Sequence, residues 1–315
     1  MTRPIAAGVD GTPESLAALE WAAVEAGRRG TELRVAHVWE PRRVSGAEER
    51  SGSSDEQERW VRQGVEDSVR GLAERHPGLT VSTHIGRGEA PEGLLEASEG
   101  AGMLVLGSRG RGLFLGFLLG SVGRQVIAEA GLPVVLVRAD VKDNGANGAN
   151  GDDSGARGDK NAEAGAGAAG EIVVGQHGEP EDSAGTLRFA FETAAACGAP
   201  VRAVRAWALP PVFAYSPGSL RLLDEAGGPV PFERKALSTA LAPWRERFPD
   251  VPVTEHVEMG SAGEVLLSAS AGARLTVVGR RAHRSAVGSR LGSVADAVIH
   301  HAPCPVAVVP PGPAA

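Results

Sequence analysis

The chain has 315 residues, of which 42% are hydrophobic and only 4% aromatic, and its formal net charge is −7. No basic cluster carries interleaved aromatic residues, so the sequence argues against a nucleic-acid platform. No apolar run approaches the roughly 18 residues of a membrane helix, and the start MTRPIAAGVDG has no secretory signal pattern. We therefore expect a cytoplasmic protein in which Cys197 and Cys304 are buried thiols and not a disulfide.

Strand and helix patterns alternate along the first half of the chain. Thr12 and Pro13 form a good start for the first helix, and Gly131 is expected to cap the end of the last one. We expect strands at residues 5–9, 33–39, 79–85, 103–107 and 133–138, with helices beginning at Pro13, before Val61, at Pro91 and at Ser121. Such alternation predicts parallel strands, right-handed crossovers and helices on both faces of a sheet.

The same order of landmarks occurs twice. The stretch Val105–Arg138 reads VLGSRGRGLFLGFLLGSVGRQVIAEAGLPVVLVR, and VVGRRAHRSAVGSRLGSVADAVIHHAPCPVAVVP at Val277–Pro310 follows the same plan. Gly8–Trp39 likewise matches Gly175–Trp207, with one extra residue in the second copy. Each copy has a normal domain size. We therefore expect one domain at residues 1–140 and a second at 171–315.

The segment between the copies, residues 141–170, has a different composition. It contains eight glycines, eight alanines and one large apolar residue, Val141. Such a segment buries too little surface to offset its ordering entropy, so we expect a disordered linker without a site.

Glycines follow the fourth predicted strand, at the edge of an α/β sheet where ligands bind. Gly107 and Gly110 would let the main chain approach a ligand closely. Gly120 and Ser121 would present free N–H groups at a helix start, an arrangement that favours an anion. An ordinary helix cap without a ligand is the competing interpretation of Gly120 and Ser121.

Charged residues accompany these glycines. Arg109, Arg111 and Arg124 would add charge-assisted bonds to phosphate oxygens, although loop arginines are more often solvated. Asp10, at the end of the first strand, is an acceptor for an amino group or a ribose hydroxyl; its alternative role is to cap the first helix.

Other kinds of site find little support in the sequence. The P-loop pattern is missing, and the dinucleotide fingerprint does not follow the first strand. No nucleophile elbow, paired carboxylates or Cys–His arrangement is recognisable, and the histidines lack the spacing of zinc ligands. Slow ATP hydrolysis is the most catalysis that we expect.

The spacing Gly107-x₂-Gly110-x₉-Gly120-Ser121 resembles the nucleotide-binding pattern of the universal stress protein family, as do GVDGTPES, PVVLVR and CPVAVVP. The resemblance implies two Rossmann-like domains, each a five-stranded parallel sheet of order 3-2-1-4-5 with helices on both faces. It also implies that the two domains pair through their fifth strands and that ATP-binding members hold an adenine nucleotide.

Carried over residue by residue, the resemblance gives each position an expected role. Asp10 would face the adenosine, and the main chain of Val38 would meet adenine. Gly8 would keep the end of the first strand open. The phosphates and ribose would be held by Gly107, Arg109, Gly110, Gly120, Ser121 and Val122.

The second copy departs from this pattern. Ala282 replaces Gly110, His177 replaces Asp10, and Ala206 replaces Val38. Alanine is strained wherever a positive φ is needed, so Ala282 would not suit such a turn. His177 lacks the permanent hydrogen-bond acceptor that Asp10 provides. We therefore expect the first domain to bind ATP, with or without Mg, and the second to carry a degenerate site that binds nucleotide poorly or not at all. The alternative is that Ala282 is tolerated and that Arg280, Arg281 and Arg284 hold an anion of a different kind.

The sequence supports three functions to different degrees. The first is an ATP-binding regulator of stress response or dormancy, with an unknown regulatory partner and a further homodimer left open. The second is a nucleotide-free scaffold that acts through protein contacts. The third is an adenylyl- or phosphoryl-transfer enzyme on a related fold.

Overall fold

The computed structural model describes residues 3–40, 51–108, 119–139, 170–208, 228–281 and 291–312, with the side chains of 51–55 excepted. Nearly all of the predicted linker lies outside these residues, as do Arg109, Gly110 and Arg111.

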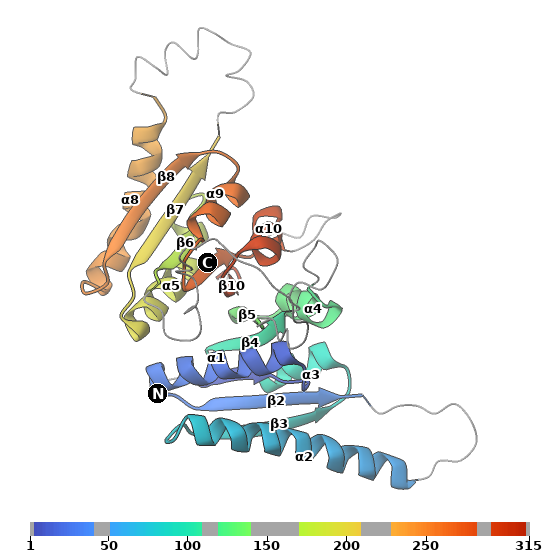
Figure 1. Cartoon of the computed structure of the whole chain (residues 1–315). Coiled ribbons are helices and arrows are strands. Elements are labelled where there is room, and N and C mark those ends of the chain that lie inside the picture. The colour runs from blue at the N-terminus through green and yellow to red at the C-terminus, as the bar shows by residue number, and fades with distance from the viewer. Residues whose placement is uncertain are drawn as a thin grey trace, which may run out of the picture.

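Each half alternates strands and helices, as the sequence predicts (Figure 1). The first half contains β1 (Ile5–Gly8), α1 (Pro13–Arg29), β2 (Leu33–Trp39), α2 (Ser51–Arg75), β3 (Val81–Arg87), α3 (Ala90–Ala97), β4 (Met103–Ser108), α4 (Ser121–Glu129) and β5 (Val134–Arg138). The second contains β6 (Ile172–Gly175), the 3₁₀ turn η1 (Pro180–Ser183), α5 (Ala184–Cys197), β7 (Val201–Trp207), α8 (Val230–Arg247), β8 (Val253–Met259), α9 (Ala262–Ala269), β9 (Leu275–Gly279), α10 (Ser293–His301) and β10 (Val306–Val309).

All ten described strands form one sheet of order β3-β2-β1-β4-β5-β10-β9-β6-β7-β8. Within each half the strands are parallel and follow the predicted order 3-2-1-4-5, so the fold prediction is confirmed. The halves meet through their fifth strands, β5 and β10, which pair antiparallel with Val135 opposite Ala307. This pairing removes what would otherwise be one exposed sheet edge in each half.

Helices cover both faces of the sheet. On one face α1, α2, α5 and α8 pack over the alternate strand residues, including Val105, Val135, Val277 and Ala307. The opposite set of strand residues faces α3, α4, α9 and α10. Strands buried on both faces explain the near-continuous Val, Ile, Leu and Ala runs in the sequence.

The ends of the helices show where the local sequence determines the cap and where it does not. Thr12 caps α1 as predicted, because its side chain accepts a hydrogen bond from Ser15 N at 3.2 Å and Pro13 follows at the first helical position. The prediction for Gly131 is wrong: α4 ends at Glu129, and the residue that caps it is Ala130, with φ −54° and ψ 132°. Extended backbone at Ala130 leads toward β5, so no left-handed residue is needed there.

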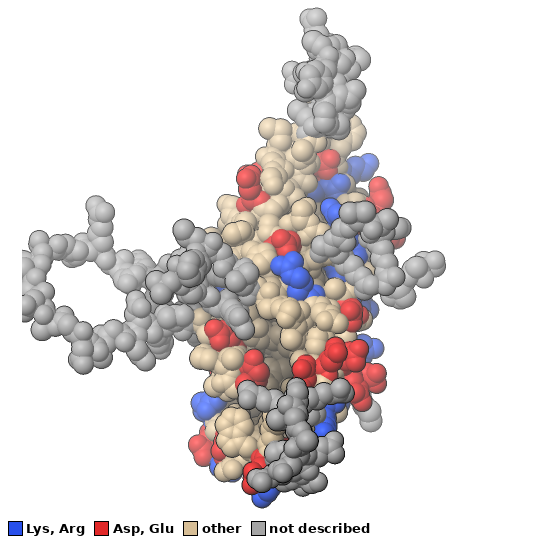
Figure 2. Space-filling view, turned by 90° about the vertical axis from the view of Figure 1, so that its right-hand side faces the viewer, with Lys and Arg blue, Asp and Glu red and all other residues tan. Residues whose placement is uncertain are grey.

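The described surface is mixed in charge. Figure 2 shows acidic and basic side chains interspersed over the visible face, without a large basic patch among the residues coloured there. Of the helices that the structure describes, none has the length and apolar character needed to cross a membrane.

Candidate functional site

The predicted site residues of the first half lie at the carboxyl ends of the central strands and at the start of α4. Gly8 ends β1, Asp10 follows it, and Gly107 lies near the end of β4, the neighbour of β1. Val38 lies near the end of β2, on the other side of β1. The strand order thus brings these four positions to the same edge of the sheet.

Asp10 organises the turn between β1 and α1. Its Oδ1 accepts hydrogen bonds from Thr12 N at 3.0 Å and from Thr12 Oγ1 at 2.6 Å. Its main-chain N donates to Ser15 Oγ at 3.2 Å. Burial raises the pKa of Asp10, but hydrogen bonds from Thr12 and Ser15 lower it by more, so its pKa lies below the usual value. Asp10 is therefore an exposed, ionised acceptor, and Thr12 provides the helix cap in its place.

Gly107 is required by packing against α1. A Cβ at this position would lie 2.5 Å from the main-chain carbon of Glu14, and 2.6 Å from both Glu14 O and Ser15 N. No real Cβ tolerates such distances to main-chain atoms. The sequence attributes Gly107 to the approach of a ligand, whereas the structure gives it the separate task of letting β4 touch the start of α1.

Gly8 and Val38 are also constrained by the packing of neighbouring side chains. A Cβ on Gly8 would lie 2.6 Å from Leu106 Cδ2 and 3.0 Å from Leu94 Cδ2. Both methyl groups of Val38 would lie 2.8 Å from a Cβ on Gly93 in α3. The side chain of Val38 therefore packs on α3, which leaves its main chain as the part available at the strand end.

The start of α4 differs from these positions, because no contact or backbone strain among the described residues requires a glycine at position 120. Gly120, the N-cap of α4, has φ −57° and ψ 159°, a conformation that any residue adopts. No described atom lies within 4 Å of where its Cβ would stand. A glycine N-cap offers no side chain to the first N–H groups of the helix. Ser121 is exposed and Val122 is half-buried, so these N–H groups begin a helix whose positive dipole end suits an anion.

The equivalent helix start in the second half is filled. Gly292, the N-cap of α10, has φ +66°, in the region that favours glycine. A Cβ there would lie 3.2 Å from both Cγ and Nε of Arg281. The Arg281 side chain thus lies over the turn at Gly292, whereas no described atom lies within the same distance of the Cβ position of Gly120. Gly292 is explained by backbone conformation and by this contact, without a ligand.

The first turns of the two helices carry opposite charges. Arg124 of α4 and Asp296 of α10 occupy the same place in GSVGR and GSVAD. Their side chains approach each other, with Arg124 Nη1 3.8 Å from Asp296 Oδ1. A carboxylate in the first turn of α10 complements the dipole of that helix and disfavours a bound anion.

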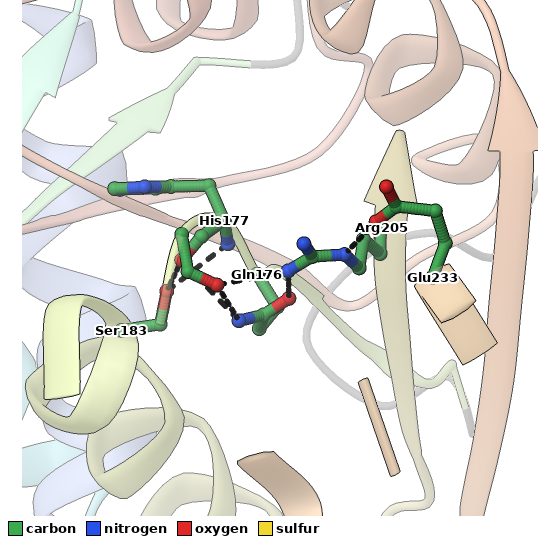
Figure 3. Close-up of polar contacts among 6 residues, drawn as sticks. Gln176, His177, Ser183, Arg205 and Glu233 are labelled. Carbon is green, nitrogen blue, oxygen red and sulfur yellow. Dashed lines mark hydrogen bonds and ion pairs between the residues drawn. The ribbon is translucent and has the colours of Figure 1, made fainter. Parts of the chain in front are cut away.

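The strand ends of the second half are occupied by a polar network (Figure 3). Gln176 is buried and takes the place of Val9. Arg205 Nη1 donates to Gln176 Oε1 at 2.6 Å, and Arg205 Nε donates to Glu233 Oε2 at 2.5 Å. The ring of His177 extends away from this network (Figure 3). In the first half His37 replaces Arg205, and its Nδ1 lies 2.6 Å from Val9 O.

Comparison with known proteins decides the family. The model of the universal stress protein family matches residues 1–138 and again residues 170–310. The chain belongs to the universal stress protein family. A Mycolicibacterium smegmatis universal stress protein is 32% identical over 317 residues, covering 98% of this chain and 97% of its own. A Mycobacterium tuberculosis H37Rv universal stress protein is 33% identical over 315 residues and 96% of both chains.

Solved structures agree on the fold. A universal stress protein from Archaeoglobus fulgidus superposes with a TM-score of 0.65 at 18% identity, and the match covers 98% of each chain. The tandem arrangement of this chain is thus shared over nearly its full length with other universal stress proteins.

Sequence reasoning considers Arg281 only as a candidate ligand for an anion, and it misses the other residues that fill the second half. The change from Arg124 to Asp296 is visible when the repeats are aligned, but only the structure shows that the two side chains meet. The contact of Arg205 with Gln176 and Glu233 joins β6, β7 and α8, and no short-range motif signals it.

Proposed function

We propose that residues 1–140 form a nucleotide-binding domain that holds ATP, and that residues 171–315 form a domain whose equivalent site binds no nucleotide. One observation carries the proposal. Among the described residues, which exclude 109–118, nothing at the start of α4 requires Gly120 to be a glycine, whereas Arg281 lies against Gly292 at the start of α10. A ligand group lying against Gly120 would explain why a side chain is missing there.

The residues of the first half suit the parts of ATP. The N–H groups at Gly120, Ser121 and Val122 would hold phosphate oxygens and ribose, because they begin a helix whose dipole favours an anion. Gly107 and the family-pattern residues Arg109 and Gly110 belong to the same proposed phosphate loop, although the latter two lie outside the described residues.

The adenosine would lie at the ends of β1 and β2. Asp10, ionised and exposed, would accept a hydrogen bond from a ribose hydroxyl, and the main chain of Val38 would meet adenine. Gly8 keeps this end of β1 free of a side chain. A Mg²⁺ ion would be held mainly by the phosphates, since no group of three or more His, Cys, Asp or Glu suited to a metal occurs among the described residues.

We further propose that the protein is a cytoplasmic regulator of stress response or dormancy, in which ATP occupancy of the first domain changes its contacts with a partner protein. ATP hydrolysis is at most slow, because no described residue of the site is an obvious activator of water. A scaffold that binds no nucleotide is the opposing outcome of the test that follows.

Protein purified without added nucleotide is expected to release adenine nucleotide on denaturation. The released small molecules would be separated and identified by mass spectrometry, and their amount compared with that of the protein. ATP well below one equivalent per chain is compatible with loss during purification, so the stripped protein would then be titrated with ATP. Neither co-purified nucleotide nor binding of added ATP would favour the scaffold and refute the proposal.

A further inference from the structure

The two halves meet around a pseudo-two-fold axis. In the β5–β10 pair, Val135 lies opposite Ala307, and these are equivalent positions of the repeat. The helix pairs α4–α10 and α1–α5 flank this strand pair on the two faces of the sheet (Figure 1). If two copies of one half paired with this geometry, each residue on the axis would face its own copy.

The two side chains that face each other at the axis differ in size. Val135 and Ala307 are both 0% exposed and belong to the core under α1 and α5. A first half paired with itself would place valine against valine, and a second half paired with itself would place alanine against alanine. The first arrangement crowds the core and the second leaves a void, and both destabilise a close-packed interior.

The α4–α10 pair is asymmetric in charge. Arg124 faces Asp296, again at equivalent positions. Pairing of like halves would bring arginine to arginine or aspartate to aspartate. Both side chains are about half exposed, so this contact selects partners more by repulsion of wrong pairs than by its own strength.

The α1–α5 pair is asymmetric in polarity. Both helices end at a left-handed glycine, Gly30 and Gly198, and this alignment makes Glu25 equivalent to Thr193. Glu25 is 1% exposed and accepts a hydrogen bond from Arg29 Nε at 2.6 Å, while Arg29 Nη2 donates to Thr193 Oγ1 at 2.8 Å across the interface.

Pairing of two identical halves would change this polar contact, whichever half is paired with itself. Two first halves would bury a second Glu25 carboxylate, with its own Arg29, where the chain now has the neutral hydroxyl of Thr193, which doubles the buried charge at this contact. Two second halves would have no guanidinium to meet Thr193, because Cys197 occupies the place of Arg29.

We infer that the β5 face of the first half and the β10 face of the second are built to pair with each other and to reject a second copy of themselves. The partner of each face is therefore the complementary half of this chain. Guanidinium groups add hydrogen bonds across the interface from both halves. Arg138 donates to the carbonyls of Ile299 and Ala302 at the end of α10, and Arg280 Nη1 donates to Ile127 O of α4 at 2.5 Å.

The full chain tests this after its tether is cut. A protease site would be placed within residues 141–169, the folded protein cleaved, and the product weighed by native mass spectrometry. The cleaved protein would then be mixed with isotope-labelled cleaved protein, unfolded in urea and refolded together. We expect only pairs of one first half with one second half, including mixed-label pairs. Pairs of two first halves or two second halves in random proportion would overturn the inference.

Variants of the uncut chain give an independent result that does not need refolding. Val135→Ala creates the alanine pair, and Ala307→Val creates the valine pair. Each is expected to lower the melting temperature by several degrees, whereas the two together should recover at least half of the summed loss. Combining Ala307→Val with Val201→Ala, a buried change in β7, should be additive. If the losses of melting temperature add in Val135→Ala/Ala307→Val just as they do in Ala307→Val/Val201→Ala, complementary packing at the axis is contradicted.

Discussion

Gly120→Asp is expected to abolish detectable ATP binding while leaving the fold intact. Aspartate is a favourable N-cap, so stability should be unchanged or higher by a few tenths of a kcal/mol. Its carboxylate would, however, stand where the proposal puts a phosphate, and like charges in close contact cost several kcal/mol, about 100-fold or more in affinity. Titration calorimetry with ATP measures the loss, and thermal unfolding measures the stability.

The control for Gly120→Asp adds the same charge to the other end of the same helix. Gly131 follows α4, and no described atom lies within 4 Å of its Cβ position. Gly131→Asp should leave ATP affinity within about two- to threefold of the wild type, because it lies at the opposite edge of the sheet from the proposed phosphates. Similar losses in both variants would show that the effect is not local to the start of α4.

Gly107→Ala is expected to destabilise the protein by about 3 kcal/mol or more, at or above the upper end for an overpacked core. The added methyl would meet main-chain atoms of Glu14 and Ser15 at 2.5–2.6 Å, and a helix start cannot move aside as a side chain can. Chemical denaturation of the full chain would measure the change in the free energy of unfolding.

The repeat supplies a matched control for Gly107→Ala. At the equivalent Gly279, a Cβ would meet only the side-chain Oγ1 of Thr186, at 3.0 Å. Gly279→Ala should therefore cost clearly less. A larger loss in Gly279→Ala than in Gly107→Ala would contradict the packing explanation for the glycine in β4.

Most of the fold follows from the sequence because it depends on local patterns. Alternating strand and helix periods, short connections and the right-handed crossover rule lead to a parallel sheet, and the repeated landmarks predict two copies of it. Thr12 and Pro13 act through residues within one turn, so their role in starting α1 is readable in the sequence.

Long-range contacts limit how far the site follows from the sequence. The glycine at 107 looks like one that serves a ligand, yet its clash partner is α1, more than ninety residues away in the chain. Gly120 and Gly292 occupy the same place in the repeated motif but differ in backbone conformation. Only the structure shows that the side chain of Arg281 lies over Gly292. The sequence predicts Gly131 as a helix cap because glycine often is one, but Ala130 caps α4 instead, with extended backbone that leads toward β5.

Calorimetric titration of the nucleotide-stripped full chain with ATP tests the central asymmetry most directly. We expect a single class of site with one ATP per chain. Two equivalent sites per chain would contradict the closure of the second half by Arg281, Asp296 and the Arg205 network, and the absence of any binding would contradict the proposed role of Gly120 and the start of α4.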